Sequence, residues 1–351
     1  MQSAGKLIKA EKWWNDKAPP VLGLAFFLLA TRDSEISLVR SVLTLLAFMV
    51  TFIGVAGYGH VINDICDVDP DRAAGKHNTM AGRPRAQVAA ILVLLLAVAW
   101  LPWLFLPANR WNLSLIGLQL LLLTVYAAPP FRFKARAVPG VVTDALYAYT
   151  VPALITWTTF ADMAGEPTPR ALLLATVVPW SFLAGLRGIL NHQYLDADND
   201  LQTGVTTFAT RYGRAKTLNL LSAIVLPAEA LCFAAVTMAF GADLRFYVAG
   251  VAAFIVWRTF QLVYLWDASL GLPWRLGRER AVTLYGYQFL GEFYTNWFPL
   301  FMLAALAWRW PEYLALAAAY VAVFQNGLVN VFKYDLRYIA AGIAKMTKRH
   351  G

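Results

Sequence analysis

Cysteine and charged residues are scarce in this sequence, and both scarcities exclude classes of protein. The chain of 351 residues has two cysteines, Cys66 and Cys232, in different apolar regions, so no disulfide framework or cysteine zinc site is expected. Charged residues make up only 15% of the chain and hydrophobic residues 59%. We find no soluble domain, low-complexity stretch or linker, and the composition indicates a polytopic membrane protein.

The hydrophobic residues gather in runs of about the length that crosses a bilayer. Ten candidate segments lie at 18–31, 41–62, 86–106, 113–128, 139–160, 171–190, 217–240, 246–266, 284–308 and 311–331. Because these runs lack apolar/polar alternation, helices are favoured over a closed barrel. Residues 1–31 superficially resemble a signal peptide but lack a convincing cleavage site, so we keep the first run as a membrane helix. The sequence predicts an all-α polytopic membrane bundle of about nine or ten transmembrane helices, in a single membrane domain over residues 1–351.

Lysine and arginine are unevenly divided between the two ends of these segments. If the N-terminus is cytoplasmic, 23 of the 30 fall on the cytoplasmic side and six on the other. The positive-inside rule then places both termini in the cytoplasm and the protein in the inner (cytoplasmic) membrane. A basic cytoplasmic face attracts anionic lipid, which explains the net charge of +9 without nucleic-acid binding. Oligomeric state has no signal in the sequence.

An acidic cluster, "NDICDVDPDR" at residues 63–72, follows the second apolar run. Carboxylates this close repel one another unless a cation offsets them, so the cluster indicates a metal or a polycationic partner. Asp64, Asp67 and Asp71 have the spacing i, i+3, i+7 and can project from one side of a helix, whereas Asp69 points elsewhere and is expected to be solvated. Pro70 should disturb the helix near Asp71.

A second acidic cluster, "LDADND" at residues 195–200, also follows an apolar run. Asp196 and Asp200 lie 129 residues after Asp67 and Asp71, and their i, i+4 spacing again suits one side of a helix, with Asp198 solvated. The repeated order indicates an internal duplication, with halves at about 18–130 and 139–266, followed by C-terminal helices at 284–331 and a basic tail. Two such halves would bring the two acidic clusters face to face.

Calcium-binding loops are the obvious alternative, because both clusters begin like an EF-hand. Both fail at position six, where Arg72 and Leu201 replace glycine, and at position twelve, where Asn78 and Thr207 replace glutamate. Two carboxylate clusters with few other ligands suit magnesium, which completes its coordination with water and substrate phosphate. Basic residues near the clusters would neutralise the remaining phosphate charge: Arg72, Lys76, Lys134 and Arg136.

Three stretches together resemble the UbiA-type intramembrane prenyltransferases. "NDICDVDPD" is similar to the family's NDxxDxxxD motif, "DADNDLQTGVTTFATRYG" to its second motif, and "YAAPPFRFKAR" at 126–136 to the end of its fourth helix. The resemblance spans most of residues 5–310. Where some relatives have a further aspartate this chain has Gln193, and residues 311–351 exceed the usual pattern.

The resemblance implies a helical bundle around a central cavity that holds two magnesium ions and a prenyl diphosphate. The metal site it implies consists of Asn63, Asp64, Asp67, Asp71, Asp196 and Asp200. Lys134 and Arg136 would contact the diphosphate. The implied reaction is ionisation of the C–O bond, with the allylic cation passing to a nucleophilic acceptor, expected to be small and aromatic.

Residues for the two organic partners are less certain from sequence. Aromatic faces such as Tyr126, Tyr147, Tyr149, Tyr287 or Tyr294 could stabilise positive charge, although most aromatics in a membrane protein pack or anchor it. Charged residues inside membrane segments are functional candidates, which places Asp144 and Arg187, with His192, near the acceptor. Arg258 and Glu292 are expected to form a structural ion pair.

Three hypotheses remain open at this point. The first is prenyl transfer to an aromatic or other small nucleophile. The second, on the same fold, is transfer to a phosphorylated acceptor, a lipid headgroup or phosphoribose, or a cyclisation. The third is a cation-coupled transporter, for which inverted repeats with midplane sites would be expected.

The N-terminal stretch "KLIKAEKWWNDKAPP" predicts a short helix at the cytoplasmic interface. Its tryptophans would anchor it at headgroup depth. The segment is either a simple anchor or a lid whose lysines, Lys6, Lys9 and Lys12, face the diphosphate.

Overall fold

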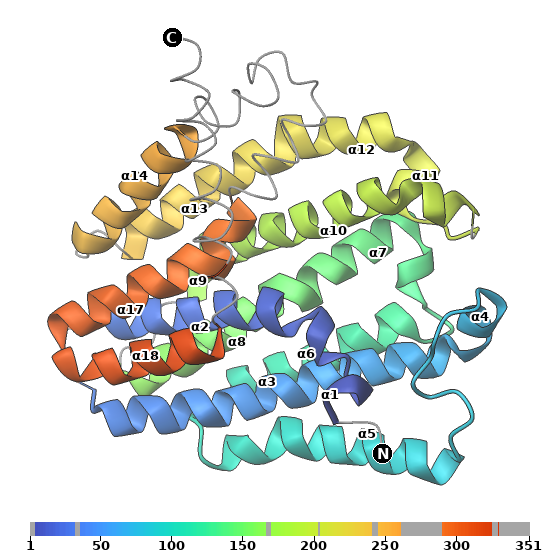
Figure 1. Cartoon of the computed structure of the whole chain (residues 1–351), viewed down its shortest axis with the longest axis horizontal. Coiled ribbons are helices and arrows are strands. Elements are labelled where there is room, and N and C mark those ends of the chain that lie inside the picture. Colours follow the sequence, from blue (N-terminus) through green and yellow to red (C-terminus); the bar gives the residue numbers. More distant parts are fainter. Residues whose placement is uncertain are drawn as a thin grey trace, which may run out of the picture. The chain divides into compact units, whose positions relative to one another are not determined.

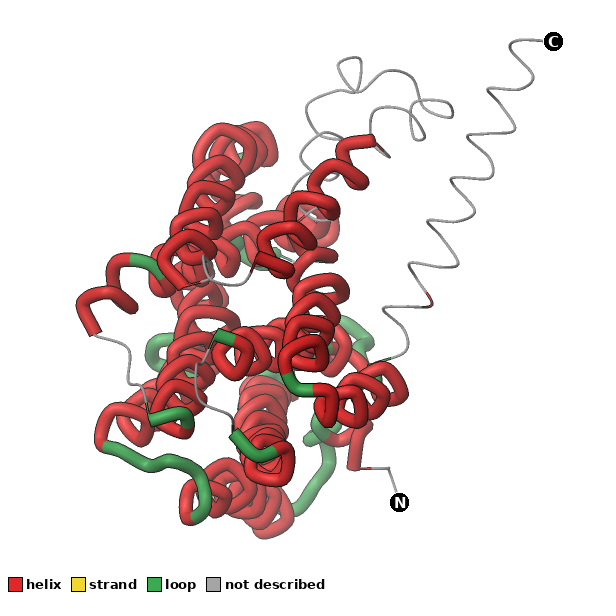
Figure 2. The backbone as a smooth tube through the Cα atoms, turned by 90° about the vertical axis from the view of Figure 1, so that its left-hand side faces the viewer, coloured by secondary structure: helices red, strands yellow, loops and turns green. Residues whose placement is uncertain are grey.

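The computed structural model describes residues 4–31, 36–165, 170–202, 204–240, 245–260, 290–324 and 329. Within these residues every regular element is helical, as the sequence predicts, and Figure 2 shows only helix and loop there. Five helical stretches are long and apolar enough to cross a membrane: Leu38–Cys66, Arg85–Leu104, Ala137–Met163, Ala171–Gln202 and Arg214–Ala239. Large apolar side chains are exposed on their surfaces, as lipid requires; Val93 and Leu94 are 66% and 63% exposed. The chain is therefore an integral membrane protein with several helical spans.

The chain forms two compact units, and both acidic motifs lie in the first, which comprises Met1–Trp14 and Asp33–Phe233. Its helical elements run in this order: α1 (Ala4–Leu7), η1 (Ala10–Lys12), α3 (Leu38–Cys66), α4 (Val68–Ala73), α5 (Arg85–Trp100), η2 (Leu101–Leu104), α6 (Arg110–Ala127), η3 (Phe133–Ala135), α7 (Ala137–Ala145), the π-helical turn η4 (Leu146–Thr150), α8 (Val151–Met163), α9 (Arg170–Ala175), α10 (Val177–Gln202), α11 (Phe208–Tyr212), α12 (Arg214–Leu220), the π-helical turn η5 (Leu221–Val225) and the start of α13 (Leu226–Phe240).

Helix α3 packs against α5 and α6, and α10 packs against α7 and η4 (Figure 1). Two glycines set the close approaches. A Cβ atom on Gly54 would lie 2.4 Å from the backbone nitrogen of Ala99 in α5, and one on Gly185 would lie 2.7 Å from Cα of Ala145 in α7. Small residues at such crossings let membrane helices approach closely, so α3 with α5 and α10 with α7 form close pairs within the first unit.

The second unit comprises Asn15–Arg32 and Ala234–Gly351. It contains α2 (Trp14–Ala30), the end of α13, α14 (Arg245–Phe260), the π-helical turn η9 (Phe293–Trp297), α17 (Phe298–Arg309), η10 (Pro311–Tyr313) and α18 (Leu314–Val323). Aromatic contacts join these helices: Phe27 to Phe298, Phe26 to Tyr320, and Phe254 to Phe293.

Several sequence predictions lie partly or wholly outside the described residues. They are Tyr287, the C-terminal basic tail, the ends of the last three apolar runs, and the side chain of Arg258, so the expected Arg258–Glu292 pair stays a prediction. The predicted duplication and single-domain organisation also stay predictions.

Candidate active site

Helix α3 ends at Cys66, and Asp67 caps it with φ −108° and ψ 9°. Pro70 explains the break, because proline has no N–H for the carbonyl four residues earlier and its ring would clash with that carbonyl. That carbonyl belongs to Cys66, and it accepts a hydrogen bond from Nη1 of Arg132 at 3.3 Å instead. The break lies at Asp67, whereas Asp71, where the disturbance was predicted, is inside α4 and donates its backbone N–H to the carbonyl of Asp67 at 2.8 Å. The break opens the end of α3 to an arginine from another loop.

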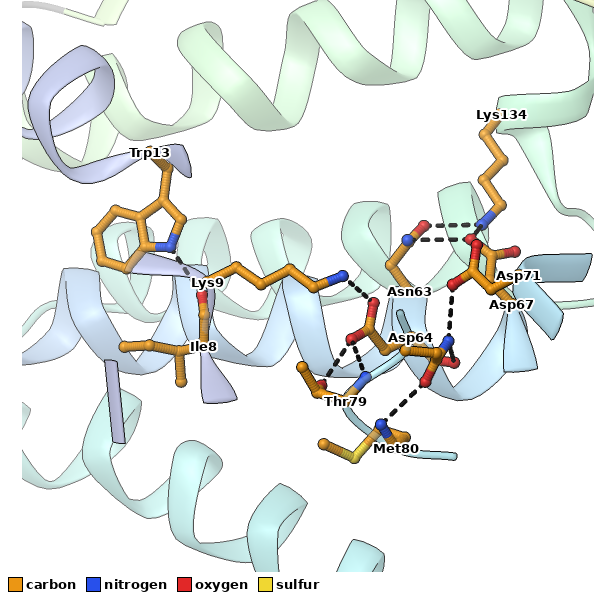
Figure 3. Close-up of polar contacts among 11 residues, drawn as sticks. Ile8, Lys9, Trp13, Asn63, Asp64, Asp67, Asp71, Thr79, Met80 and Lys134 are labelled. Atoms are coloured by element: carbon orange, nitrogen blue, oxygen red, sulfur yellow. Dashed lines mark hydrogen bonds and ion pairs between the residues drawn. The ribbon is translucent and has the colours of Figure 1, made fainter. Parts of the chain in front are cut away.

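Asp67 is the centre of a cluster of cations and amides at this break. Nη2 of Arg132 donates to Oδ1 of Asp67 at 2.9 Å, and the ammonium of Lys134 donates to Oδ2. Nδ2 of Asn63, one helical turn earlier, also donates to Oδ2 at 3.0 Å, and Lys134 donates to Oδ1 of Asn63 at 2.7 Å. Figure 3 shows Asp67 beside Asn63 and Lys134. Burial lowers the pKa of Lys134, while the hydrogen bond and charge of Asp67 act in the opposite direction.

The loop between α6 and α7 supplies these cations, but not as the sequence predicts. Arg132, at φ 39°, aims its guanidinium at Asp67. Arg136 instead donates to the carbonyl of Pro130 at 3.0 Å and lies over the Phe133 ring, in an exposed position. Sequence reasoning missed Arg132; its place two residues before Lys134, inside the stretch "YAAPPFRFKAR", was the available signal.

The other carboxylates of the first motif have separate partners. Asp64 is 1% exposed and binds Lys9 and Thr79. Asp71 is half-buried and accepts from Nδ2 of Asn78 at 2.8 Å. Sequence reasoning had not assigned Asn78 or Thr79 a role, because nothing in their spacing ties them to the acidic cluster.

The second motif stands on an unbroken helix, since α10 continues to Gln202. Asp196 and Asp200 therefore share one side of α10, as predicted, and their charges interact. Nε2 of His192 lies 3.5 Å from Asp196, so His192 belongs to this cluster; its contact with an acceptor stays a prediction. The charge of Lys76 also acts on Asp200, which places the loop after the first motif near the second.

Gln193, where some relatives have an aspartate, is buried and has a structural partner. Its Oε1 accepts the backbone N–H of Phe208, the first residue of α11, at 2.9 Å. Orphan amides at a helix start need such an acceptor. Gln193 thus holds the turn that follows the second motif.

Two aspartates face away from the site, as predicted. The side chains of Asp69 and Asp198 are 86% and 73% exposed. Asp69 accepts from Arg72 and Asp198 from Arg214. Arg72, which sequence reasoning assigned to the diphosphate, therefore lies with Asp69 on the outer surface.

A further carboxylate, Asp144, lies at the end of α7, just before the π-helical turn η4. The hydroxyl of Tyr147 donates to Oδ2 of Asp144 at 2.5 Å. The Tyr126 and Tyr147 rings meet edge to face, 5.0 Å apart, and the Tyr126 hydroxyl interacts with both neighbours. The charge of Asp67 acts on the Tyr126 hydroxyl, so the group of Asp144, Tyr147 and Tyr126 adjoins the cluster at the end of α3. Single π-turns inside helices are frequent at functional sites.

Arg187, which the sequence analysis places near the acceptor, has a buried structural partner. It lies within α10, and its Nε donates to Oε2 of Glu229 in α13 at 2.7 Å, with side chains 5% and 0% exposed. A buried arginine needs such a partner. The ion pair joins α10 to α13, and a role of Arg187 at the acceptor stays a prediction.

The donor set can be compared with what magnesium requires. Within the described ranges, no three His, Cys, Asp or Glu side chains converge on one point. Magnesium seldom uses an all-protein cage; it takes one or two carboxylates and completes its shell with water and phosphate oxygens. The pair Asp196 and Asp200, and Asp67 with Asn63 and Asp71, fit that requirement.

Two curated relatives have similar sequences. The lycopene elongase/hydratase of Halobacterium salinarum is 29% identical over 192 residues, which cover 54% of this chain and 65% of the relative. That of Haloferax volcanii is 29% identical over 212 residues, covering 60% of this chain and 66% of the relative. The chain spans just under two thirds of the length of these relatives.

Solved structures share the fold. A UbiA homolog from Archaeoglobus fulgidus bound to DMAPP and Mg²⁺ matches with a TM-score of 0.56 and 19% identity, over 86% of this chain and 98% of that chain. A digeranylgeranylglyceryl phosphate synthase structure matches with a TM-score of 0.52 and 16% identity, over 97% of each chain. The UbiA prenyltransferase family matches residues 19–276. This chain therefore belongs to the UbiA prenyltransferase family.

Proposed function

We propose that the protein is a magnesium-dependent intramembrane prenyltransferase that ionises a prenyl diphosphate. The observation that carries the proposal is the meeting of Asp67 and Asn63 with Arg132 and Lys134 at the end of α3. A diphosphate needs fixed cations for its oxygens and carboxylates that can share a metal with it, and this cluster offers both. The A. fulgidus homolog, whose structure contains DMAPP and Mg²⁺, supports it.

Each group has a role in this proposal. The metal ligands are Asn63, Asp67, Asp71, Asp196 and Asp200. Two magnesium ions, when bound, would neutralise charge on the leaving diphosphate. Arg132 and Lys134 turn from Asp67 to the diphosphate oxygens and orient the substrate, and Lys76 lies near Asp200 for the same purpose.

The group of Asp144, Tyr147 and Tyr126 is proposed to serve the acceptor. When a carbon of the acceptor attacks the allylic cation, a C–C bond forms and the acceptor carries the positive charge. That charge is discharged when a neighbouring C–H bond breaks and the proton moves to a base. The Asp144 carboxylate, held by the Tyr147 hydroxyl, is the base we assign to this step.

The curated relatives bear on the acceptor. Sequence analysis expects a small aromatic molecule, whereas both relatives are lycopene elongase/hydratases. We therefore favour a polyene acceptor of the lycopene type over an aromatic one. Addition to an alkene and substitution on an aromatic ring both require the base described above, so the site chemistry suits either.

The test is an assay of the purified protein in detergent with DMAPP or GPP, magnesium and candidate acceptors. We expect magnesium-dependent release of diphosphate, and a lycopene product that has gained isoprene units, with or without water, by mass spectrometry. Products formed only from an aromatic acceptor or from a glycerol phosphate lipid would reassign the acceptor. Absence of magnesium-dependent diphosphate release with every substrate would contradict the proposed function.

A further inference from the structure

Asp64, which the family resemblance assigns to the metal, is buried among protein partners; its side chain is 1% exposed, against 16% for Asp67. Its Oδ1 accepts from Nζ of Lys9 at 2.5 Å, and its Oδ2 accepts from Oγ1 and the backbone N–H of Thr79 at 2.6 and 3.2 Å. A carboxylate that is 1% exposed is stable only when paired and hydrogen-bonded in this way.

The contacts of the side chains separate Asp64 from its neighbours in the motif. Asn63 and Asp64 are successive residues of α3, so their directions differ by about 100°. Asn63 and Asp67, four residues apart, face one side and share Lys134. Asp64 faces another side, towards Lys9 and Thr79, as Figure 3 shows.

The N-terminal segment, residues 4–13, is seated on α3 by other contacts too. Trp13 is buried, meets the ring of Phe52 edge-on at 5.6 Å, and donates through Nε1 to the carbonyl of Ile8 at 2.9 Å. Ile8 lies so close to Gly57 that a Cβ there would be 2.9 Å from its Cγ2. Lys9 adopts the left-handed conformation, with φ 51°, between the two short helical turns α1 and η1. The predicted single interfacial helix is thus two turns with Lys9 at the break.

The loop after the first motif is joined to the same point. Nδ2 of Asn78 donates to the backbone carbonyl of Asp64 and to Oδ2 of Asp71, both at 2.8 Å. Oδ1 of Asn78 accepts the backbone N–H of Met80 at 2.9 Å. The position of Asp71 therefore depends on the loop that Thr79 fastens to Asp64.

We propose that Asp64 is a positioning residue and not a metal ligand. It fastens the N-terminal segment through Lys9 and the 78–80 turn through Thr79 to the end of α3, which fixes the direction in which Asn63 and Asp67 point. The part of this inference that concerns the metal rests on the proposed function; the part that concerns the N-terminal segment does not.

Hydrogen exchange measured by mass spectrometry on the full chain in detergent tests the structural part. Lys9→Met and Asp64→Asn should each speed exchange of the amides at residues 5–13 by about tenfold or more, the change expected when a charge-assisted hydrogen bond is lost. Lys12→Met, an exposed lysine of the same segment, is the matched control and should leave exchange unchanged. Lys9→Met leaves Asp64 in place, so this variant still tests the contact if Asp64→Asn does not fold. Unchanged exchange in Lys9→Met would overturn the proposal.

Metal binding tests the second part. The melting temperature is measured at increasing magnesium concentrations in the presence of an unreactive prenyl thiodiphosphate. The readout is the midpoint, the magnesium concentration at which half of the full increase in melting temperature is reached. Asp67→Asn should raise that midpoint about tenfold or more, whereas Asp64→Asn should change it by about threefold or less. Equal shifts in the two variants would make Asp64 a ligand and overturn the proposal. If the wild-type protein itself shows no magnesium-dependent stabilisation, the proposed function fails, while the exchange result still decides whether Asp64 holds the N-terminal segment.

Discussion

At the scale of single residues, the acidic motifs contain aspartates with three kinds of surroundings. Asp67 lies among cations and an amide, Asp64 is buried against Lys9 and Thr79, and Asp69 and Asp198 are exposed beside arginines. Similar side chains in one short stretch should therefore respond very differently to substitution.

Loss of either proposed metal pair should disable the enzyme. Asp67→Ala and Asp196→Ala should each lower the turnover of prenyl diphosphate on the order of a hundredfold or more, because a metal contributes several kcal/mol to stabilising the leaving group. The double variant should be little worse than either single one, since the site works as a unit. Diphosphate release at several magnesium concentrations measures this.

Asp69→Ala and Asp198→Ala are the matched controls, with activity expected within about threefold of wild type because surface ion pairs contribute little. A uniform modest decline in all four variants, with no change in magnesium dependence, would refute the two-metal interpretation.

Asp144 should affect the fate of the cation more than its formation. In Asp144→Asn we expect diphosphate release to persist while the yield of the deprotonated, alkene product per diphosphate falls about tenfold or more, since the acceptor cation then loses its proton slowly and is captured by water. The ratio of product to diphosphate is the measurement. Equal losses of both would assign Asp144 to packing or to substrate binding instead.

At the scale of elements, the site depends on two helix crossings and one ion pair. Gly54 lets α3 approach the backbone of α5, whereas Gly117 in α6 has open space where a Cβ would stand. Gly54→Ala should therefore destabilise the protein by ~1–3 kcal/mol through overpacking. Gly117→Ala should be neutral or slightly stabilising, since alanine is the better helix former. Melting temperatures in detergent compare the two, and an equal effect would argue against close packing at Gly54.

Breaking the ion pair between α10 and α13 should lower the free energy of unfolding strongly, whereas replacing both partners by apolar residues should lower it little. Glu229→Gln or Arg187→Met alone should destabilise by ~3–5 kcal/mol, because a buried charge loses its partner. The double variant Arg187→Met with Glu229→Leu should recover most of that stability. A single variant of Arg187 that keeps full stability but loses acceptor binding would support its predicted role at the substrate.

At the scale of the whole molecule, both acidic motifs should lie on the cytoplasmic side of the membrane, as the distribution of lysine and arginine predicts. The test places single cysteines in a protein whose Cys66 and Cys232 are replaced by serine. Ala74→Cys follows the first motif, and Ala108→Cys lies in the loop at the other end of α5. Both positions are exposed. A membrane-impermeant maleimide should label intact cells only at position 108, and position 74 only after permeabilisation. The reverse pattern would invert the topology.

The sequence by itself was enough to predict the helical class, the two acidic motifs, the exposure of Asp69 and Asp198, and five of the ten apolar segments, which coincide with helical spans in the described residues. These features are local, because they follow from the length of apolar runs and from helical spacing. The family match agrees with the resemblance carried by three short stretches.

Only the tertiary structure decided which side chains meet. Lys9 reaches Asp64 across 55 residues, Arg132 rather than Arg136 reaches Asp67, and Arg187 lies against Glu229. Such contacts depend on the rotation of each helix about its axis and on the path of each loop. One residue changes a side chain's direction by about 100°, and spacing within a single helix cannot fix that angle relative to another helix. The sequence therefore located the two acidic motifs of the candidate site, and packing between the helices determined the partners of their carboxylates.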